Sequence, residues 1–377
     1  MVTMQFIDLT VQYDLIRDNV QQRMNKVLEH ARFIMGPEVE ELEERLAHYC
    51  GVKHAIACGS GTDALQMALM VLGLVPGDEV IMPAFSYFAT AEVCLLLKLK
   101  PIFVDIDART YNIDPQRIAE AITPRTKAIM PVSLFGQCAD FDAINAIAAQ
   151  HGLFVIEDGA QSFGASYKGR RSLSLSTIGC TSFFPSKTLG CYGDGGMCFT
   201  NDENIAKKLR MIRVHGQSEI YVHDIVGINS RLDTLQAAVL LAKFELFTDE
   251  AQQREQIAAC YDAHLTDLVD TPYIEPYNRS IYSQYTIATD HRDTLQQLLK
   301  TQNIPSNIYY SKPMPTQTAY AGQGYKTDLF LQTESACKRV LSLPMHPYLK
   351  PLEQEQIIKA VQNAILTDNH SNQHVSG

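Results

Sequence analysis

The sequence predicts an α/β fold with a mostly parallel sheet, joined to a smaller α+β domain. Between residues 54 and 200, short apolar runs of strand length alternate with helical segments, as in sheets that helices cover on both faces. After about residue 245 the pattern changes to one long helix and then to mixed strands and helices with several prolines. The chain has 377 residues, of which 46% are hydrophobic and 20% charged, so it is large enough for two domains. We assign residues 30–245 to the large domain and residues 1–29 and 246–377 to the smaller one.

The predicted elements begin with a helix at residues 37–50. Pro37 suits its first turn, apolar residues recur on one face, and Gly51 is a typical end. A short apolar run at 54–58 predicts a strand. A second helix follows a glycine turn and ends at Gly73.

The alternation continues through the rest of the large domain. Apolar runs of strand length begin at residues 80, 101, 128, 154, 180 and 197. The segment 140–152 between two of them predicts a crossover helix, with Asp140 as its N-cap and Gly152 at its end. Such crossover helices are what parallel strand pairing requires.

Composition and charge exclude several classes of protein. The formal net charge is -10, from 42 acidic and 32 basic residues without a basic cluster, so we expect no binding to nucleic acid. The N-terminus has no signal-peptide pattern and no apolar run is long enough for a membrane span, so we expect a soluble, cytoplasmic protein. The nine cysteines form no C-x-x-C pair and no zinc spacing, which predicts buried reduced thiols and no metal site.

Three polar stretches follow predicted strands, where open α/β sheets bind ligands. The first is Gly-Ser-Gly-Thr-Asp at residues 59–63, between a strand and a helix. Its glycines allow close approach of an anion and the helix N-terminus presents amides, so Gly61 and Thr62 are candidate phosphate ligands. Two alternatives are a plain structural turn and a dinucleotide-binding turn, since Gly59, Gly61 and Ala64 match G-x-G-x-x-A. The acidic residue that this fingerprint requires after the second strand is missing.

The second stretch ends the apolar strand at 154–158. Asp158 is suited to pair with a protonated pyridinium nitrogen, which makes the ring a better electron acceptor. Ala160, two residues later, leaves space for a flat ring. An Asp at a strand end is also typical of a structural cap and of a Walker-B metal ligand, although no G-x-x-x-x-G-K-[ST] motif accompanies it.

The third stretch runs from Ser182 to Lys187, before a glycine-rich segment at 190–196. A lysine just after an apolar strand, among aromatic and small residues, lies in a site of low dielectric constant. There its amine loses its proton readily and can form an imine. A surface lysine in a loop is the alternative interpretation.

Together the three stretches supply what pyridoxal phosphate needs: a phosphate cradle, a carboxylate for the ring nitrogen and an imine-forming lysine, on consecutive strand ends. Tyr87, directly after another strand, is the candidate for stacking on the ring, whereas Phe85 and Phe88 are alternatives that belong to the core. We therefore predict pyridoxal phosphate as the cofactor, with Lys187 and Asp158 as the catalytic residues.

These motifs resemble those of the DegT/DnrJ/EryC1/StrS family of sugar aminotransferases. The resemblance covers nearly the whole chain and is carried by SGTDAL at 60, PAFSYFATAE at 83, GQCADFDAI at 136, EDGAQSFGA at 157, TSFFPSKTLGCYGDGG at 181, NSRLDTLQAA at 229 and LSLPMHPYL at 341. It implies the aspartate aminotransferase-like fold (PLP fold type I) and a homodimer with shared active sites. The motifs are most similar to those of aminotransferases that act on UDP-2-acetamido-2-deoxy-3-oxo-glucuronate, on the pathway to diacetamido uronic acids of bacterial surface polysaccharides.

The resemblance also implies roles for further residues around the cofactor. Ser182 and Thr62 bind its phosphate, together with Asn229 reaching in from the other subunit. Gln161 contacts the ring hydroxyl.

For the substrate, the resemblance implies that Arg231 meets the sugar carboxylate, where a planar guanidinium suits a bidentate grip. The alternative for Arg231 is an ion pair with Asp233 or a contact with a helix end. Tyr310 and His215 are further candidates for substrate binding. Tyr309 stands where the most similar members tend to have histidine.

The activity that the resemblance implies is transamination at C3 of a nucleotide-linked keto-sugar, with L-glutamate converted to 2-oxoglutarate. One alternative is an aminotransferase for a neutral 3-keto or 4-keto sugar. Others are a PLP-dependent sugar dehydratase, an NAD-binding protein and a non-catalytic regulatory protein on the same scaffold. The dehydratases carry histidine in place of the lysine, so Lys187 argues against them, and a regulatory protein needs neither Lys187 nor Asp158.

Overall fold

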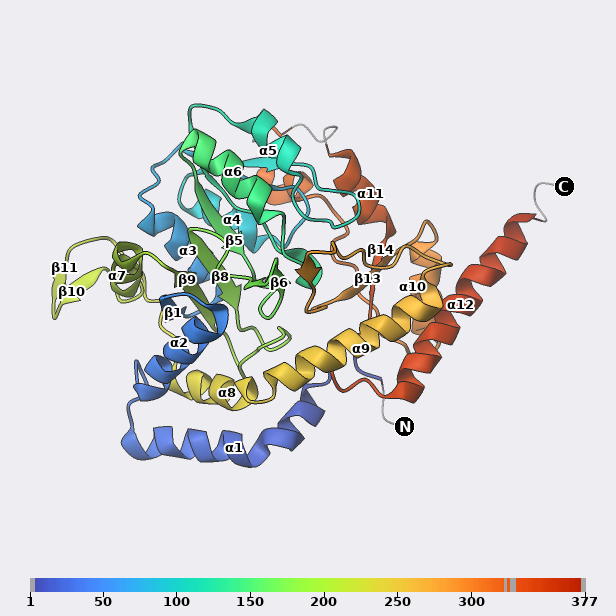
Figure 1. Cartoon of the computed structure of the whole chain (residues 1–377), viewed down its shortest axis with the longest axis horizontal. Helices are drawn as coiled ribbons and strands as arrows, with labels where there is room; N and C mark the ends of the chain where they lie inside the picture. Colours follow the sequence, from blue (N-terminus) through green and yellow to red (C-terminus); the bar gives the residue numbers. More distant parts are fainter. Residues whose placement is uncertain (1–3, 322–323, 326–329, 374–377) are drawn as a thin grey trace.

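The computed structural model describes residues 4–321, 324–325 and 330–373. A seven-stranded sheet forms the centre of the large domain (Figure 1). In spatial order its strands are β1 (His54–Cys58), β9 (Gly196–Thr200), β8 (Ile178–Ser182), β5 (Phe154–Asp158), β4 (Thr126–Ile129), β2 (Glu79–Pro83) and β3 (Lys100–Val104). β9 runs antiparallel to both of its neighbours, and the other pairings in this sheet are parallel. The predicted mostly parallel sheet is therefore confirmed.

Helices cover both faces of this sheet. Alternate residues of a strand point to opposite faces, and here both sets are apolar, so each face needs a covering layer. Ile129 and Val155 join the core under one face, whereas their neighbours Ala128 and Ile156 join the core under the other. The first face is covered by α2 (Pro37–Cys50), α5 (Pro115–Ala121), α6 (Phe141–His151) and α8 (Thr234–Phe244). The second is covered by α3 (Gly61–Val71), α4 (Ala89–Leu96) and α7 (Glu203–Ile212).

The helix boundaries follow the predicted capping signals. α2 begins at Pro37 and ends before Gly51, which adopts a left-handed conformation. The side chain of Asp140 caps α6, and Gly152 ends that helix, again in a left-handed conformation. Both signals are local, and both predictions are confirmed.

One predicted strand is shorter and shifted along the chain. The apolar run from residue 128 predicted a strand there, but β4 spans Thr126–Ile129. Pro131 lies just beyond and has no amide to donate to the ladder, so regular pairing does not continue through it.

The chain after the sheet builds a second core around the long helix expected after residue 245, which is α9 (Phe247–Leu265). With α9 pack the antiparallel pair β13 (Tyr285–Ala288) and β14 (Val340–Leu343), α10 (Arg292–Thr301) and α12 (Pro351–Gln373). α11 (Leu331–Arg339) precedes β14, and a small sheet joins β6 (Ser166–Tyr167), β7 (Arg170–Arg171) and β12 (Asn278–Arg279). Residues 374–377 of the polar tail lie outside the described part of the chain. Across the described residues, no helix combines the length and hydropathy that a membrane span requires.

The N-terminal helix α1 (Leu9–His30) lies along α8 (Figure 1). Ile16 of α1 packs against Val239 of α8, while Met4, just before α1, packs against the C-terminal core. The N-terminal segment thus contacts both parts of the molecule. The division into residues 30–245 and the remainder stays a prediction.

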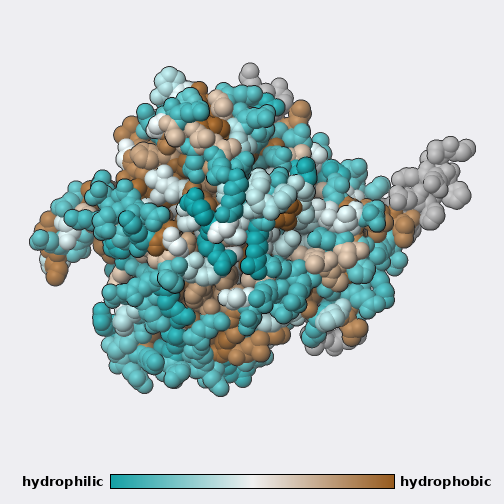
Figure 2. Space-filling view, viewed as in Figure 1, coloured by the Kyte–Doolittle hydropathy of each residue, from teal (hydrophilic) through white to brown (hydrophobic). Residues whose placement is uncertain are grey.

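A hairpin of β10 (Gln217–Glu219) and β11 (Val222–His223) projects from the body, at the left of Figure 1. Its turn exposes 78% of Ile220 and 91% of Tyr221. Figure 2 shows brown, hydrophobic atoms at the end of this projection. The hairpin leaves the large domain between α7 and α8, the same segment that carries the predicted residues His215 and Asn229.

Candidate active site

The polar stretches predicted from the sequence lie at one edge of the sheet. Strands β1, β2, β5 and β8 run in the same direction and end at Cys58, Pro83, Asp158 and Ser182. The antiparallel β9 begins at that same edge, since Gly196 pairs with both Cys58 and Ser182. The carboxyl ends of the parallel strands therefore gather the candidate residues, as open α/β sheets require.

Asp158 is buried at this edge, and the partly buried Lys187 interacts with it electrostatically. Asp158 is only 6% exposed, and its burial raises the pKa of its carboxyl above the ordinary value. Burial lowers the pKa of the Lys187 ammonium, and the Asp158 charge opposes that shift. Low dielectric surroundings thus favour the neutral amine at Lys187, the form that an imine-forming lysine needs. Lys187 is thus partly buried rather than exposed, and its role as the imine-forming lysine stays a prediction.

The Asp158 carboxylate is held by two donors, neither of which was predicted. Its Oδ2 accepts a hydrogen bond of 2.8 Å from the hydroxyl of Thr90, and its Oδ1 accepts one of 3.2 Å from the amide of Ala160. Thr90 lies in the first turn of α4 and is fully buried. Sequence reasoning missed Thr90 because it follows the motif residue Tyr87 and has the appearance of an ordinary helix residue.

The glycine stretch forms a tight loop against the end of β8. The side chain of Ser60 caps α3, so the amides of Gly61 and Thr62 lie in the first turn, where no preceding helical carbonyl is available to them. A Cβ added at Gly61 would lie 2.6 Å from the Cβ of Ser182, so only glycine permits this approach. The structure therefore brings Gly61, Thr62 and Ser182 together.

The dinucleotide-binding alternative for this loop is wrong. In dinucleotide folds, the strand before the glycine turn lies inside a parallel sheet. Here β1 is an edge strand whose one neighbour in the sheet is the antiparallel β9.

Gln161 and Tyr310 meet beside Asp158, although they come from distant parts of the chain. The Gln161 side-chain amide donates to the Tyr310 hydroxyl at 3.0 Å, and its carbonyl accepts from the Phe135 amide at 2.8 Å. These contacts fix the orientation of the Gln161 amide. Burial raises the pKa of Tyr310, so its hydroxyl stays protonated at neutral pH.

The structure separates the three aromatic candidates after β2. Phe85 is 1% exposed and packs in the core, and Phe88 packs on Tyr320 at a centroid distance of 5.6 Å. Tyr87 is 63% exposed, and its ring centroid lies 6.4 Å from that of Tyr310. Of the three, Tyr87 is the ring available to stack on a ligand.

The segment with Asn229 and Arg231 lies beside the glycine loop of its own chain. Ser230 accepts a hydrogen bond from the Gly59 amide at 3.0 Å and donates one to Asp63 at 2.8 Å. Within the described residues, the Nε of Arg231 is buried and has no hydrogen-bond partner. Its guanidinium is therefore placed to receive a further acceptor.

The remaining two predicted residues face solvent. Asn229 and His215 are exposed and lie at the base of the β10–β11 hairpin, where the Asn229 backbone forms a bridge with Val214. Their predicted contacts with cofactor and substrate stay predictions.

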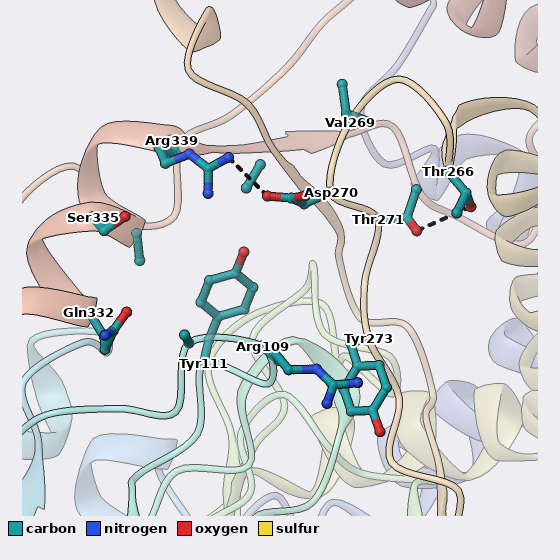
Figure 3. A pocket seen from close by; sticks show the side chains of 13 residues that line it. Arg109, Tyr111, Thr266, Val269, Asp270, Thr271, Tyr273, Gln332, Ser335 and Arg339 are labelled. Carbon is teal, nitrogen blue, oxygen red and sulfur yellow. Dashed lines mark hydrogen bonds and ion pairs between the residues drawn. The ribbon is translucent and has the colours of Figure 1, made fainter.

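A separate cavity of about 460 Å³ lies away from these residues (Figure 3). Arg109 and Tyr111 line it from the segment after β3, and Asp270, Tyr273 and Arg339 line it from the C-terminal part. Arg339 is paired with Asp270, and the Arg109 guanidinium lies over the Tyr273 ring. None of the residues predicted for catalysis or binding lines this cavity.

The residues at the sheet edge fit pyridoxal phosphate. A glycine cradle at a helix N-terminus suits its phosphate, a buried carboxylate suits its ring nitrogen, and a partly buried lysine with lowered pKa suits its aldehyde. When bound, this cofactor supplies an electron sink for the carbon that loses a proton. A seven-stranded sheet of this order with such a site defines a pyridoxal phosphate-dependent enzyme of the aspartate aminotransferase-like fold (PLP fold type I).

The chain belongs to the DegT/DnrJ/EryC1/StrS aminotransferase family, whose sequence model matches residues 14–362. It is therefore an aminotransferase that uses pyridoxal phosphate and acts on nucleotide-linked keto-sugars. The predicted fold, cofactor and enzyme class are confirmed.

Similarity extends over nearly the whole chain. The sequence is 54% identical over 360 residues to the UDP-2-acetamido-2-deoxy-3-oxo-D-glucuronate aminotransferase of Pseudomonas aeruginosa, covering 95% of this chain and 99% of that protein. It is 43% identical over 354 residues to the UDP-N-acetyl-3-dehydro-alpha-D-glucosamine 3-aminotransferase of Acidithiobacillus ferrooxidans, covering 94% and 95%. The structure of S. venezuelae DesV in complex with a ketimine intermediate matches with a TM-score of 0.94 at 37% identity, covering 96% of this chain and 98% of that one.

Proposed function

We propose that this enzyme transfers the amino group of L-glutamate to C3 of UDP-2-acetamido-2-deoxy-3-oxo-D-glucuronate, in the synthesis of a diacetamido uronic acid for a bacterial surface polysaccharide. The observation that carries the proposal is the meeting of the buried Asp158 with the partly buried Lys187 at the sheet edge. The choice of sugar is supported by the 54% identity to the Pseudomonas aeruginosa enzyme named for this substrate.

In this proposal, Lys187 holds the cofactor covalently and moves the proton between the reacting carbons, while Asp158 keeps the ring nitrogen protonated. Gly61, Thr62 and Ser182 hold the phosphate from within the chain. The close packing of Gly61 on Ser182 supports their shared role.

Two further residues complete the cofactor contacts. Tyr87 stacks on the ring, which its exposure supports, and Gln161 contacts the ring hydroxyl from the position that Tyr310 and Phe135 impose. Asn229 of the partner subunit completes the phosphate site. The enzyme is thus proposed to be a homodimer with shared active sites.

For the sugar, Arg231 of the partner subunit, from the same segment as Asn229, is proposed to bind the carboxylate at C6. Its buried Nε, which has no partner among the described residues, supports this role, because a buried donor without an acceptor is costly. Tyr310 and His215 contact the remainder of the sugar nucleotide.

A substrate comparison tests the choice of sugar. The purified enzyme, glutamate and one keto-sugar nucleotide are incubated, and aminated product is detected by mass spectrometry. We expect the highest kcat/KM with the UDP-3-oxo-uronate. The second candidate is the neutral UDP-N-acetyl-3-oxo-glucosamine, favoured by the 43% identity to the Acidithiobacillus ferrooxidans enzyme. A higher kcat/KM with this neutral sugar would overturn the uronate assignment.

A variant of Arg231 tests its role in binding the sugar carboxylate. Arg231→Ala should spare the half-reaction with glutamate and lower kcat/KM for the uronate by a factor of roughly 10 to 100, the scale of a lost charge-assisted hydrogen bond. Arg117→Ala is the matched control, because Arg117 is exposed and paired with Glu120. An Arg231→Ala enzyme that handles the uronate as well as the control does would contradict the acidic-sugar assignment.

Mixed dimers test the assembly. Lys187→Ala and Arg231→Ala subunits are each impaired alone, but a mixed dimer should contain one site with both native residues. Recovered uronate turnover on mixing supports the shared site. Mixed dimers that form without recovering activity would show that each site uses one chain.

A further inference from the structure

A chain of two buried hydroxyls ends on the Asp158 carboxylate. The Ser86 and Thr90 hydroxyl oxygens are 3.0 Å apart, and Thr90 lies 2.8 Å from Oδ2 of Asp158. Ser86 is 5% exposed and Thr90 is fully buried. Ser86 directly precedes Tyr87 in the segment between β2 and α4, and Thr90 follows in the first turn of α4, so the exposed ring and the two buried hydroxyls come from one short stretch of chain.

The direction of these hydrogen bonds follows from counting protons. An ionised carboxylate only accepts hydrogen bonds, and a hydroxyl has one proton to donate. If Asp158 is ionised, the Thr90 proton is committed to Oδ2, so the Ser86 hydroxyl must donate to the Thr90 oxygen. Each donor in such a chain polarises the next, which strengthens the bond to the carboxylate.

This arrangement opposes the effect of burial on Asp158. Burial by itself raises the pKa of the carboxyl, whereas the hydrogen bond from Thr90 is the largest influence that lowers it. The Ala160 amide holds the other oxygen, so the plane of the carboxylate is set from two directions. The titratable side chains that interact with Asp158 are Lys187, Glu157, Tyr310 and Cys180.

We propose that Thr90 and Ser86 are positioning residues that keep the Asp158 carboxylate charged and aimed at the ring nitrogen of the cofactor. Neither hydroxyl touches a reacting atom in this proposal, and both act through Asp158. The inference rests on the role proposed above for Asp158. The inference adds that hydrogen bonds from Thr90 and Ser86 allow the buried Asp158 carboxylate to stay ionised.

The test compares Thr90→Val, which keeps the shape and removes the hydroxyl, with Thr90→Ser, which keeps the hydroxyl. Ser86→Ala removes the outer donor. For each holoenzyme, two quantities are measured: the rate of the half-reaction with glutamate, and the pH midpoint of the visible absorbance of the bound cofactor. The second quantity reports ring protonation without turnover, because a proton on the ring nitrogen disfavours a proton on the Lys187 imine.

We expect Thr90→Val to slow the half-reaction by roughly 10- to 100-fold, the factor that corresponds to a lost hydrogen bond to a charged group. The absorbance midpoint should move to higher pH, in the same direction as in Asp158→Asn. Thr90→Ser should stay within about threefold of wild type, because the donor remains. Ser86→Ala should show a smaller change of the same sign.

A double-mutant cycle decides whether Thr90 acts through Asp158. In the Asp158→Asn background, Thr90→Val should have little additional effect. Effects that add fully would overturn the inference, as would a Thr90→Val enzyme with unchanged rate and midpoint. If Thr90→Val does not fold, Thr90→Ser and Ser86→Ala are compared instead. An absorbance midpoint that equals the wild-type value in both variants would overturn the inference. If Asp158→Asn itself changes nothing, the proposed role of Asp158 fails first.

Discussion

The contact between Gly61 and Ser182 makes a quantitative prediction about the cofactor cradle. In Gly61→Ala, the new Cβ would lie 2.6 Å from the Cβ of Ser182 and 3.2 Å from its Oγ. Carbon atoms pack at about 3.5–4.0 Å, so the start of α3 and the end of β8 must move apart by about 1 Å. Ser182 Oγ also accepts a hydrogen bond from the Phe184 amide, in the turn that leads to Lys187.

The size of the effect follows from two opposing terms. Overpacking of this kind costs about 1–3 kcal/mol. Alanine in place of glycine in a helix gains up to about 1 kcal/mol. The overpacking cost is therefore expected to exceed the gain in helix propensity, with a net loss of about 1–2 kcal/mol in the free energy of unfolding. The Kd for pyridoxal phosphate is expected to rise roughly tenfold or more.

The assay combines urea unfolding of the apoenzyme with titration of the apoenzyme by pyridoxal phosphate. Gly193→Ala is the matched control, because the nearest atom to its new Cβ is Nε2 of Gln236 at 3.1 Å, the far end of a flexible side chain. We expect the control to change stability by less than about 1 kcal/mol. The reasoning is refuted if Gly61→Ala binds the cofactor as tightly as the control does.

Three further predictions concern buried charges. Lys187→Ala should fold but lose the borohydride-reducible adduct with the cofactor and all transamination; an adduct that persists in this variant would disprove the assignment. Asp158→Asn should still bind cofactor and turn over orders of magnitude more slowly, a barrier increase of several kcal/mol, and turnover within about tenfold of wild type would contradict the electron-sink role. Burial lowers the pKa of Lys243 from 10.5 to about 8, so between those pH values the unfolded chain holds a proton that the folded chain lacks, and stability rises with pH across that window. Lys243→Met should remove this rise and add roughly 2–3 kcal/mol to the free energy of unfolding at pH 7, and parallel pH profiles of urea unfolding for both proteins would rule this out.

Much of the large domain was predictable because its signals are local. Pro37, Gly51, Asp140 and Gly152 act on the backbone within one turn of themselves, and they end the helices where the sequence indicated. The strands are recognisable because both of their faces are buried, which leaves uninterrupted apolar runs. The strand predicted from residue 128 is shorter in the structure, where β4 ends at Ile129. The apolar run continues, but Pro131 has no amide hydrogen to pair with a neighbouring strand.

The chemistry of the site was predictable to a similar depth. Once strands of a parallel sheet are recognised, the residues that follow each strand must gather at one edge, so Asp158 and Lys187 were placed together from sequence alone. The glycine stretch at 59–63 indicated a phosphate cradle, whereas the phosphate role of Ser182 depended on resemblance. The structure shows that Gly61 lies directly against Ser182. The assignments of Asn229, His215 and Arg231 depended on resemblance, since no local pattern connects them with the strand ends.

The sequence by itself determined the elements, their order and the residue types delivered to the sheet edge, because each depends on backbone preferences and apolar patterns within a few residues. Only the tertiary structure decided that β9 enters the sheet antiparallel between β1 and β8, that α1 lies along α8, and that Thr90 donates to Asp158 across 68 positions of chain. These contacts arise when segments far apart in sequence pack to bury apolar surface and to satisfy buried polar groups. A single buried threonine produces no periodic sequence pattern, so its contact with a distant carboxylate can be recognised only in the folded structure.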